Sequence, residues 1–566
     1  MSHVATQNPP AARAEGAFRA RIGGWGIATI LLSLPVLVPL ATVAAGLFHP
    51  DRAVWEHLVD TVLGVYVINT VLLALCVGAG TLLLGVSSAW LVTMCRFPLS
   101  RHLNWVLLLP LAMPTYLSGY AYTDLLQFTG PVQTALRALT GWQHGDYWAP
   151  EIRSLGGAAI VMSLVLYPYV YLLARAAFLA QSVCVLEAAR TLGRSPWRGF
   201  VEVALPLARP AIVGGLALAL METLADFGTV SYFGVDTFTT GIYRTWFAMG
   251  EPVAATQLAA LLMLCVFTVL VFERASRGPA RFDHTTQRWQ TLPGYRLRGL
   301  AALGAFTACL LPPLLGFAVP AAHLAKLAWE EGDQLRLTAF VDLATNSLTL
   351  AALGAVVTTA AAVILAYGLR LAPAKPVRWA ARLATLGYAI PGSVIAVGLL
   401  VPFAYFDNTI DSWARASFGL STGLMLTGGM FALLFAYLVR FLAVAANAME
   451  SGLGKVSPSL DAAARTLGRG PTRTLFFIHL PIVWGSVLTA LLTVFVDVMK
   501  ELPATLIVRP FNFETLATRV YRLASDERLG EASTASLLIV AVGLVPVILL
   551  SRAVAASRPG TEQPPL

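Results

Sequence analysis

The chain has 566 residues, of which 57% are hydrophobic and only 12% are charged, and its mean hydropathy is +0.71. A soluble protein of this length needs more charge to cover its surface, so the composition excludes a soluble protein. The formal net charge of +9 does not call for a nucleic-acid partner, because basic cytoplasmic loops of a membrane protein account for it.

Apolar stretches long enough to cross a bilayer recur from one end of the chain to the other. An α-helix needs about 20 residues to cross roughly 30 Å of hydrocarbon, and it satisfies its own backbone groups there. We therefore predict an all-α polytopic membrane protein with about 12 transmembrane helices. The expected spans are 25–47, 64–92, 103–127, 156–180, 210–232, 254–272, 299–319, 346–369, 381–403, 419–444, 484–507 and 534–552.

The charges of the loops predict how these spans are oriented. Lys and Arg concentrate in alternate loops, and loops of this kind face the cytoplasm. One outside loop breaks the rule, since it contains Arg509, Arg519, Arg522 and Arg528. The pattern as a whole still predicts that both termini are cytoplasmic.

The two halves of the chain match each other in sequence. Asn69-Thr70 pairs with Asn346-Ser347, and Ala112-Met113-Pro114 pairs with Ala389-Ile390-Pro391, both at an offset of 277 residues. We predict two parallel six-helix repeats related by an axis along the membrane normal. The expected boundaries are 1–24 (cytoplasmic tail), 25–272 (first half, core 64–272), 273–298 (cytoplasmic linker), 299–552 (second half, core 342–552) and 553–566 (cytoplasmic tail).

The best-matched part of the repeat is a basic loop rather than a span. The hexapeptide Ala-Arg-Thr-Leu-Gly-Arg occurs at 189–194 and at 464–469, and each copy is followed by Pro and then by Leu-Pro. In the second copy Ser457, Pro458 and Asp461 suit the cap, the first position and the first turn of a helix. Plain duplication would preserve loops no better than spans, so we expect an external partner to constrain this segment. An ordinary duplicated basic loop is the alternative.

These residues resemble the signature of the permeases of ATP-binding-cassette (ABC) importers, which is Glu-Ala-Ala, three residues, Gly and a hydrophobic stretch to Leu-Pro. The first copy follows the signature, whereas the second has Ala462 at the Glu position and Asp461 one residue earlier. The resemblance implies the type I importer permease fold, in which these loops are coupling helices in grooves of two nucleotide-binding subunits. The residues to which it gives this role are Glu187, Ala188, Ala189, Arg190, Gly193, Arg194, Asp461, Ala463, Ala464, Arg465, Gly468 and Arg469.

The resemblance also implies partners and a location. They are two copies of an ABC ATPase subunit, a periplasmic substrate-binding protein and the lipid bilayer of a bacterial inner membrane, with no nucleic acid. The chain is expected to be a transport subunit and not an enzyme, and to bind no cofactor, with ATP bound by the partner subunits. Its nearest approach to a phosphate-binding loop, Gly452–Lys455, has Met449 and Val456 at two required positions and therefore fails.

Charged residues inside predicted spans are costly and mark transport pathways by default. Two spans carry them, at Glu222, Asp226, Asp497, Lys500 and Glu501. Glu222 and Asp497 are 275 residues apart, as are Asp226 and Glu501, so each pair is related by the repeat. Four acids against one base favour a cationic or metal-bearing cargo. The alternative is a structural ion-pair cluster around Lys500, and no metal ligands are assigned.

Segments near the C-terminal end narrow the cargo. The stretches 500–505, 509–517 and 526–529 resemble the fused two-domain permeases of ferric-iron importers. The resemblance implies alternating access that carries ferric iron inward, although related fused permeases carry thiamine or aminoalkylphosphonates. Several tyrosines could ligate ferric iron, but an interfacial aromatic belt is the explanation that we favour for Tyr120, Tyr122, Tyr167 and Tyr169.

Two other classes of protein compete with this interpretation. An ion-coupled secondary transporter also shows twelve spans in two halves, and Glu222 and Asp497 could bind its protons or sodium. Such a transporter has no reason to keep two basic docking loops. An intramembrane enzyme needs a nucleophile–base pair or a metal constellation, and the sequence shows neither.

Overall fold

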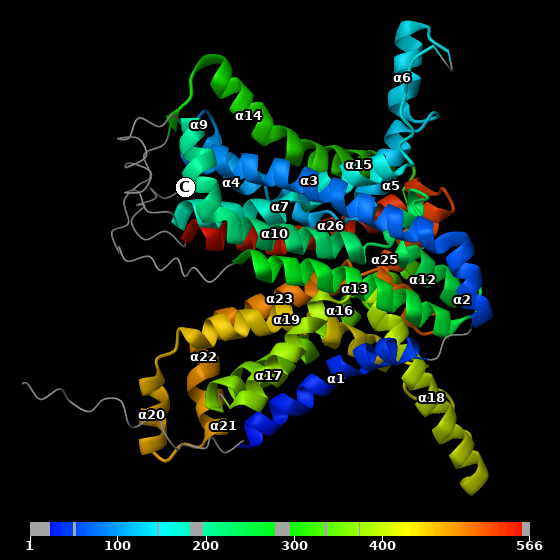
Figure 1. The fold of residues 1–566 in the computed structure, drawn as a ribbon, viewed down its shortest axis with the longest axis vertical. Coiled ribbons are helices and arrows are strands. Elements are labelled where there is room, and N and C mark those ends of the chain that lie inside the picture. Colours follow the sequence, from blue (N-terminus) through cyan, green and yellow to red (C-terminus); the bar gives the residue numbers. More distant parts are fainter. Residues whose placement is uncertain are drawn as a thin grey trace, which may run out of the picture.

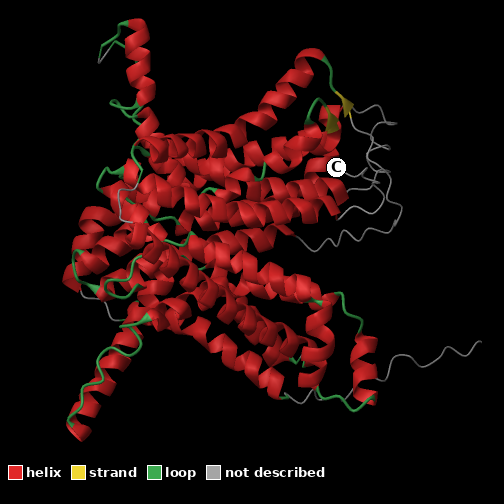
Figure 2. Cartoon of the chain, turned by 180° about the vertical axis from the view of Figure 1, so that it is seen from behind, coloured by secondary structure: helices red, strands yellow, loops and turns green. Residues whose placement is uncertain are grey.

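The computed structural model describes residues 23–48, 52–143, 146–180, 196–277, 295–332, 337–372 and 374–556. Their regular structure is helical apart from one short parallel pairing of β1 (Cys95–Arg96) with β2 (Tyr295–Arg296) (Figure 2). The first predicted coupling segment, including Glu187 to Arg194, lies outside the described residues.

The first repeat is preceded by α1 (Gly24–Gly46), α2 (Arg52–Leu58) and the π-helical turn η1 (Val59–Leu63). Its elements are α3 (Gly64–Met94), α4 (Ser100–Val106), the 3-10 turn η2 (Leu109–Ala112), α5 (Thr115–Leu126), α6 (Pro131–Thr140), α7 (Leu155–Ala180), α9 (Pro196–Gly199), the π-helical turn η3 (Phe200–Ala204), α10 (Leu205–Ala225), α11 (Gly228–Tyr232), α12 (Phe238–Phe247) and α13 (Pro252–Arg277).

The second repeat is preceded by α14 (Gly299–Pro313), the π-helical turn η4 (Leu314–Ala318) and α15 (Val319–Glu330). Its elements are α16 (Leu337–Leu371), α17 (Lys375–Ala384), the 3-10 turn η5 (Thr385–Ala389), α18 (Gly392–Phe418), α19 (Met430–Gly454), α20 (Pro458–Thr466), α21 (Pro471–Thr474), the π-helical turn η6 (Leu475–His479), α22 (Leu480–Ile482), α23 (Trp484–Met499), α24 (Pro503–Val508), α25 (Leu516–Ser525) and α26 (Leu529–Ala556). The turns η3 and η6 lie 275 residues apart, so the repeat extends to backbone detail.

The predicted fold class is confirmed, and one predicted span differs from the expectation. Among the described residues, ten helices are long and apolar enough to cross a membrane, and an eleventh is present if Pro471–Ile482 and Trp484–Met499, bent by 79°, form one span. The predicted span 103–127 is broken into α4, η2 and α5. The break lies at Pro114, which lacks the N–H that would continue a helix. The same interruption occurs before Pro391, at the start of α18.

The outermost helices are exchanged between the repeats. Helix α1 contacts α16, α17 and α18 of the second repeat, while α14 contacts α3 and α4 of the first. Two glycines permit the close approach of α1, because a Cβ on Gly368 would lie 2.6 Å from the carbonyl oxygen of Trp25 and one on Gly398 would lie 2.6 Å from that of Pro39. Small residues of this kind let transmembrane backbones pack closely.

The helices form two groups that meet at one end of the molecule and diverge toward the other (Figure 1). They meet near α12 and α25, and they are farthest apart at the end that carries α9 and α20. We call the end with α9 and α20 the coupling end and the other end the outer end. At the outer end α6 and the last turns of α18 project beyond the bundle (Figure 1).

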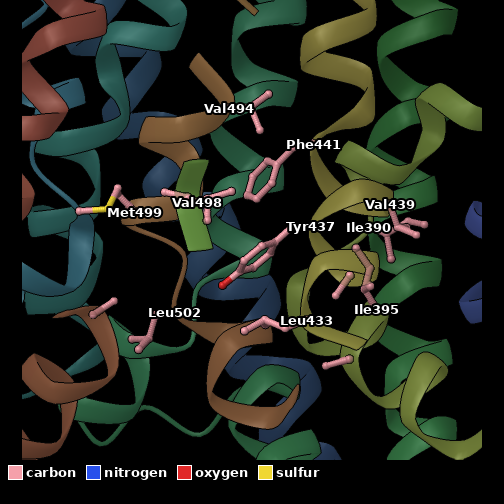
Figure 3. Close-up of a cluster of buried hydrophobic side chains, with 14 of the residues drawn as sticks. Ile390, Ile395, Leu433, Tyr437, Val439, Phe441, Val494, Val498, Met499 and Leu502 are labelled. Carbon is pink, nitrogen blue, oxygen red and sulfur yellow. The ribbon is translucent and has the colours of Figure 1, made fainter. Parts of the chain in front are cut away.

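Apolar packing holds α19 against α23. Tyr437 and Phe441 of α19 lie beside Val494 and Val498 of α23, and all four side chains are buried (Figure 3). The Tyr437 hydroxyl also shares a hydrogen bond of 2.7 Å with Thr505 Oγ1. In lipid, such van der Waals packing and interhelical hydrogen bonds replace the hydrophobic drive. This contact fixes the end of α23, beyond which the charged residues follow.

Candidate functional site: a charged cavity between the repeats

A cavity of about 110 Å³ lies between the two repeats. All five residues that the sequence predicted for the pathway line it. The polar residues of its wall are Thr115, Tyr116, Tyr169, Glu222 and Asp226 from the first repeat, and Tyr388, Arg440, Asp497, Lys500 and Glu501 from the second. The pathway role stays a prediction, but the structure brings these residues to one place.

One repeat-related pair of acids stabilises broken helices. The chain leaves helical geometry between α10 and α11, and Asp226 Oδ1 accepts hydrogen bonds from the N–H groups of Thr229 (2.9 Å) and Val230 (3.2 Å). Glu501 does the same between α23 and α24, since its carboxylate accepts from the N–H groups of Ala504 and Thr505, both at 3.0 Å. These carboxylates satisfy the first N–H groups of the following helix. Their geometry is therefore that of helix caps.

The other repeat-related pair of acids faces the cavity without capping a helix. Glu222 Oε1 accepts a hydrogen bond of 3.1 Å from the hydroxyl of Tyr388, which belongs to the opposite repeat. Asp497 Oδ1 lies 2.9 Å from Lys500 Nζ. The side chains of Asp497 and Lys500 are 18% and 32% exposed, so the pair is reachable from the cavity. Glu222 and Asp497 are thus the carboxylates best placed to meet a cargo.

The sequence reasoning missed two groups in this wall. Arg440 of α19 lies 4.0 Å from Glu501, so the cavity contains two bases against four acids, and its formal charge is −2 where the sequence predicted −3. Tyr388 was missed as well, and Tyr169 lines the cavity although an aromatic belt was favoured for it. Arg440 was detectable, because it is a single charge within the predicted span 419–444.

The second predicted coupling segment forms α20 as expected. Ser457 Oγ accepts a hydrogen bond from the N–H of Ser459, and Pro458 occupies the first position of the helix. Ala463, Arg465, Gly468 and Arg469 are exposed at the coupling end, whereas Ala464 is buried. Gly468 has φ +71°, a conformation that favours glycine and that ends the helix. The contact of these residues with an ATPase stays a prediction.

Asp461 ties α20 to the membrane helices. Its Oδ2 accepts two hydrogen bonds from Arg370 of α16, from Nε at 3.0 Å and from Nη2 at 2.7 Å. Arg370 also donates to the carbonyl oxygens of Leu453 (2.6 Å) and Val456 (2.9 Å). The buried His479 lies 3.0 Å from Asp461 Oδ1, although not in hydrogen-bond geometry. The acid that stands one residue early in this copy therefore has a structural partner.

At the outer end the repeats contact each other directly. Arg153 forms an ion pair of 3.3 Å with Glu527, and the hydroxyls of Ser231 and Tyr521 share a hydrogen bond of 3.2 Å. The rings of Phe227 and Tyr521 also lie 5.6 Å apart. Each contact joins the first repeat to the second, so the cavity is closed off by these contacts on the outer side.

Two pseudo-symmetric helical repeats around a charged cavity, with a capped surface helix at one end, define a polytopic transport permease. Residues 81–275 match the family described as "Binding-protein-dependent transport system inner membrane component". The Fe(3+)-transport system permease protein FbpB 2 of Haemophilus influenzae is 27% identical over 542 residues, which are 92% of this chain and 97% of that protein. The chain is therefore a multi-pass inner-membrane permease of the binding-protein-dependent ABC importers, with both permease halves fused, and it is a transport subunit rather than an enzyme.

Two further relatives fit this identification. The ferric transport system permease protein FbpB of Actinobacillus pleuropneumoniae is 22% identical over 80% of this chain, which spans 65% of that protein. The molybdenum transport system permease protein ModB of Escherichia coli is 28% identical over 34% of this chain and 84% of its own length. A relative of one permease half thus matches about a third of this chain, as the fusion of two halves requires.

Proposed function

We propose that this permease moves ferric iron from a periplasmic substrate-binding protein to the cytoplasm. The relatives whose names specify ferric transport align with most of the chain, whereas the molybdenum permease aligns with 34% of it. The observation that carries the proposal is the charge of the cavity, which holds four carboxylates against two cationic side chains. A wall of oxygen ligands with a formal charge of −2 suits a hard cation and opposes an oxyanion.

The energy for transport comes from partner subunits in this proposal. Two copies of an ABC ATPase bind ATP and dock on the coupling helices, of which α20 is the described one, and the chain itself binds no cofactor. The exposed face of α20 and its tie to α16 through Arg370 support a helix that transmits force to the bundle. Both termini are cytoplasmic, and the sequence halves 25–272 and 299–552 act as the two moving units.

Alternating access fits the arrangement of the helices. The repeats are joined at the outer end by Arg153 and Glu527 and diverge toward the coupling end (Figure 1). This arrangement corresponds to a state closed to the periplasm. ATP-driven approach of the coupling helices would bring the diverging ends together and release the outer contacts.

Thiamine or an aminoalkylphosphonate is the alternative cargo, and an ion-coupled secondary transporter is the alternative class. We would measure uptake of ferric iron in cells that lack their own ferric importers and express this chain with its ATPase and binding protein. Uptake should be lost in Glu222→Gln and Asp497→Asn and retained in Glu330→Gln, which removes an exposed acid on α15. Uptake of thiamine or of an aminoalkylphosphonate in place of iron would refute the cargo.

A further inference from the structure

Two phenols in the cavity have no part in the function as proposed so far. Tyr169 comes from α7 of the first repeat and Tyr388 from η5 of the second, and both line the cavity beside Glu222 and Asp497. Tyr388 donates its hydrogen bond to Glu222, and Tyr169 has electrostatic interactions with Glu222, Asp497 and Lys500. The four oxygen groups therefore form one cluster, to which each repeat contributes one phenol and one carboxylate.

A third tyrosine indicates that the cavity lacks an occupant. Tyr116 of α5 lines the same cavity and is 5% exposed, and its hydroxyl has no hydrogen-bond partner among the described residues. Buried hydroxyl groups almost always have a partner, either protein or an ordered water molecule or ligand. An unpaired hydroxyl in this wall is what a site awaiting a hydrated or ligated cargo would present.

We propose that Tyr169, Tyr388, Glu222 and Asp497 form a transient binding site for a hard trivalent cation between the two repeats. The inference rests on the proposed transport of ferric iron and locates where the ion pauses. Carboxylate and phenolate oxygens are hard ligands that match a small, highly charged ion. Because each repeat provides half of the ligands, a rocking motion of the repeats would assemble the site or pull it apart.

The charges of the cluster favour a trivalent ion. In the empty site two carboxylates and the Lys500 ammonium give −1 with both phenols protonated. When the ion binds both phenolates, their two protons pass to water as the two metal–oxygen bonds form, since metal ligands must be deprotonated. Four anionic ligands then balance the trivalent ion and the Lys500 ammonium, so the loaded site is neutral. A divalent ion on the same ligands would leave a net charge of −1.

Lys500 keeps this site weak. Its ammonium, 2.9 Å from Asp497, occupies the position of a counter-cation while the site is empty, and an incoming ion must displace it. Among the described residues no group of three or more His, Cys, Asp or Glu side chains is arranged to hold a metal ion, so a permanent high-affinity centre is not formed there. A transported ion has to be bound firmly enough to enter and weakly enough to leave.

The test uses the full chain with its ATPase partner in lipid nanodiscs, titrated with ferric nitrilotriacetate. Binding through phenolates should produce a visible phenolate-to-iron charge-transfer band and release about two protons per ion. Each of Tyr169→Phe and Tyr388→Phe should lower iron affinity by at least about tenfold, the lower end of what loss of a supporting group costs at metal sites. The double variant should lose the band.

A matched control lies two residues away on the same helix. Tyr167 is buried, but its hydroxyl donates to the carbonyl oxygen of Leu107 outside the cavity, so Tyr167→Phe should keep the band. Lys500→Met should bind iron more tightly and transport it more slowly, because the competing cation is gone. A merely structural role for the lysine would not raise affinity.

Iron uptake by the same variants separates this inference from the proposed function. If the wild type takes up iron but shows no band, or if the double variant keeps the band or full uptake, the site is wrong and the transport function stands. If the wild-type complex takes up no iron although the band forms in the cavity, the transport function is wrong and the site stands as a cation site. Absence of both overturns both.

Discussion

The tie between α20 and the membrane helices predicts a specific coupling defect. In Asp461→Asn the Arg370 guanidinium keeps its two backbone acceptors but loses the carboxylate that compensates its charge. Removing one partner of a buried ion pair costs about 3–5 kcal/mol. Asp461 and Arg370 are 18% and 17% exposed and Arg370 retains other acceptors, so we expect a loss of about 2–3 kcal/mol.

This loss should appear in coupling rather than in folding of the bundle, because α20 lies at the edge of the molecule (Figure 1). If it is expressed in ATPase binding, 2 kcal/mol weakens that binding by roughly 30-fold. The assay is the affinity of the purified ATPase subunit for the permease in nanodiscs, together with the ATPase rate that the binding protein stimulates. Glu450→Gln, which removes an exposed acid at the end of α19, is the control.

A double-mutant cycle gives the outcome that would refute this reasoning. Arg370→Met combined with Asp461→Asn leaves no uncompensated charge, so the double variant should lose less affinity than the sum of the two single variants. If the losses simply add, or if Asp461→Asn binds the ATPase as the wild type does, then Asp461 does not hold the coupling helix through Arg370.

Three further substitutions test other parts of the structure. Asp226→Asn and Glu501→Gln each remove a charged helix cap and should lower the yield of monodisperse protein in detergent, with a cost of about 1–2 kcal/mol; normal yield with selective loss of transport would assign them to the pathway instead. Arg153→Ala should change thermal stability little, because an exposed pair of this kind contributes at most about 1 kcal/mol, but it should increase cysteine accessibility of the cavity from the periplasm. Gly398→Val should reduce folding yield by about 1–3 kcal/mol of overpacking against Pro39, and unchanged stability would contradict the close approach of α1.

Much of the fold could be predicted because it repeats in sequence. The hexapeptide offset located the turns η3 and η6, and the paired acids located the ends of α10 and α23. Hydropathy alone could not show that α1 packs on the second repeat. A helix without acidic or basic residues such as α1 is apolar on every side, so its sequence does not distinguish the face in contact with protein from the face in contact with lipid.

The candidate site was predictable in its residues but not in their division of labour. The rule that intramembrane charges mark pathways found Glu222 and Asp226 together, four residues apart on a presumed continuous helix. The helix in fact ends between them, at Ala225, so one acid faces Tyr388 and the other caps α11. Tyr388 lies 166 residues from Glu222, and no local pattern joins them.

The most direct test of the account is uptake of radioactive ferric iron by proteoliposomes that contain this chain, its ATPase subunit and the binding protein. We predict accumulation that requires ATP and the ATPase, that is insensitive to collapse of the proton gradient, and that molybdate and thiamine do not inhibit. Accumulation driven by an ion gradient without ATP, or uptake of molybdate in place of iron, would contradict it.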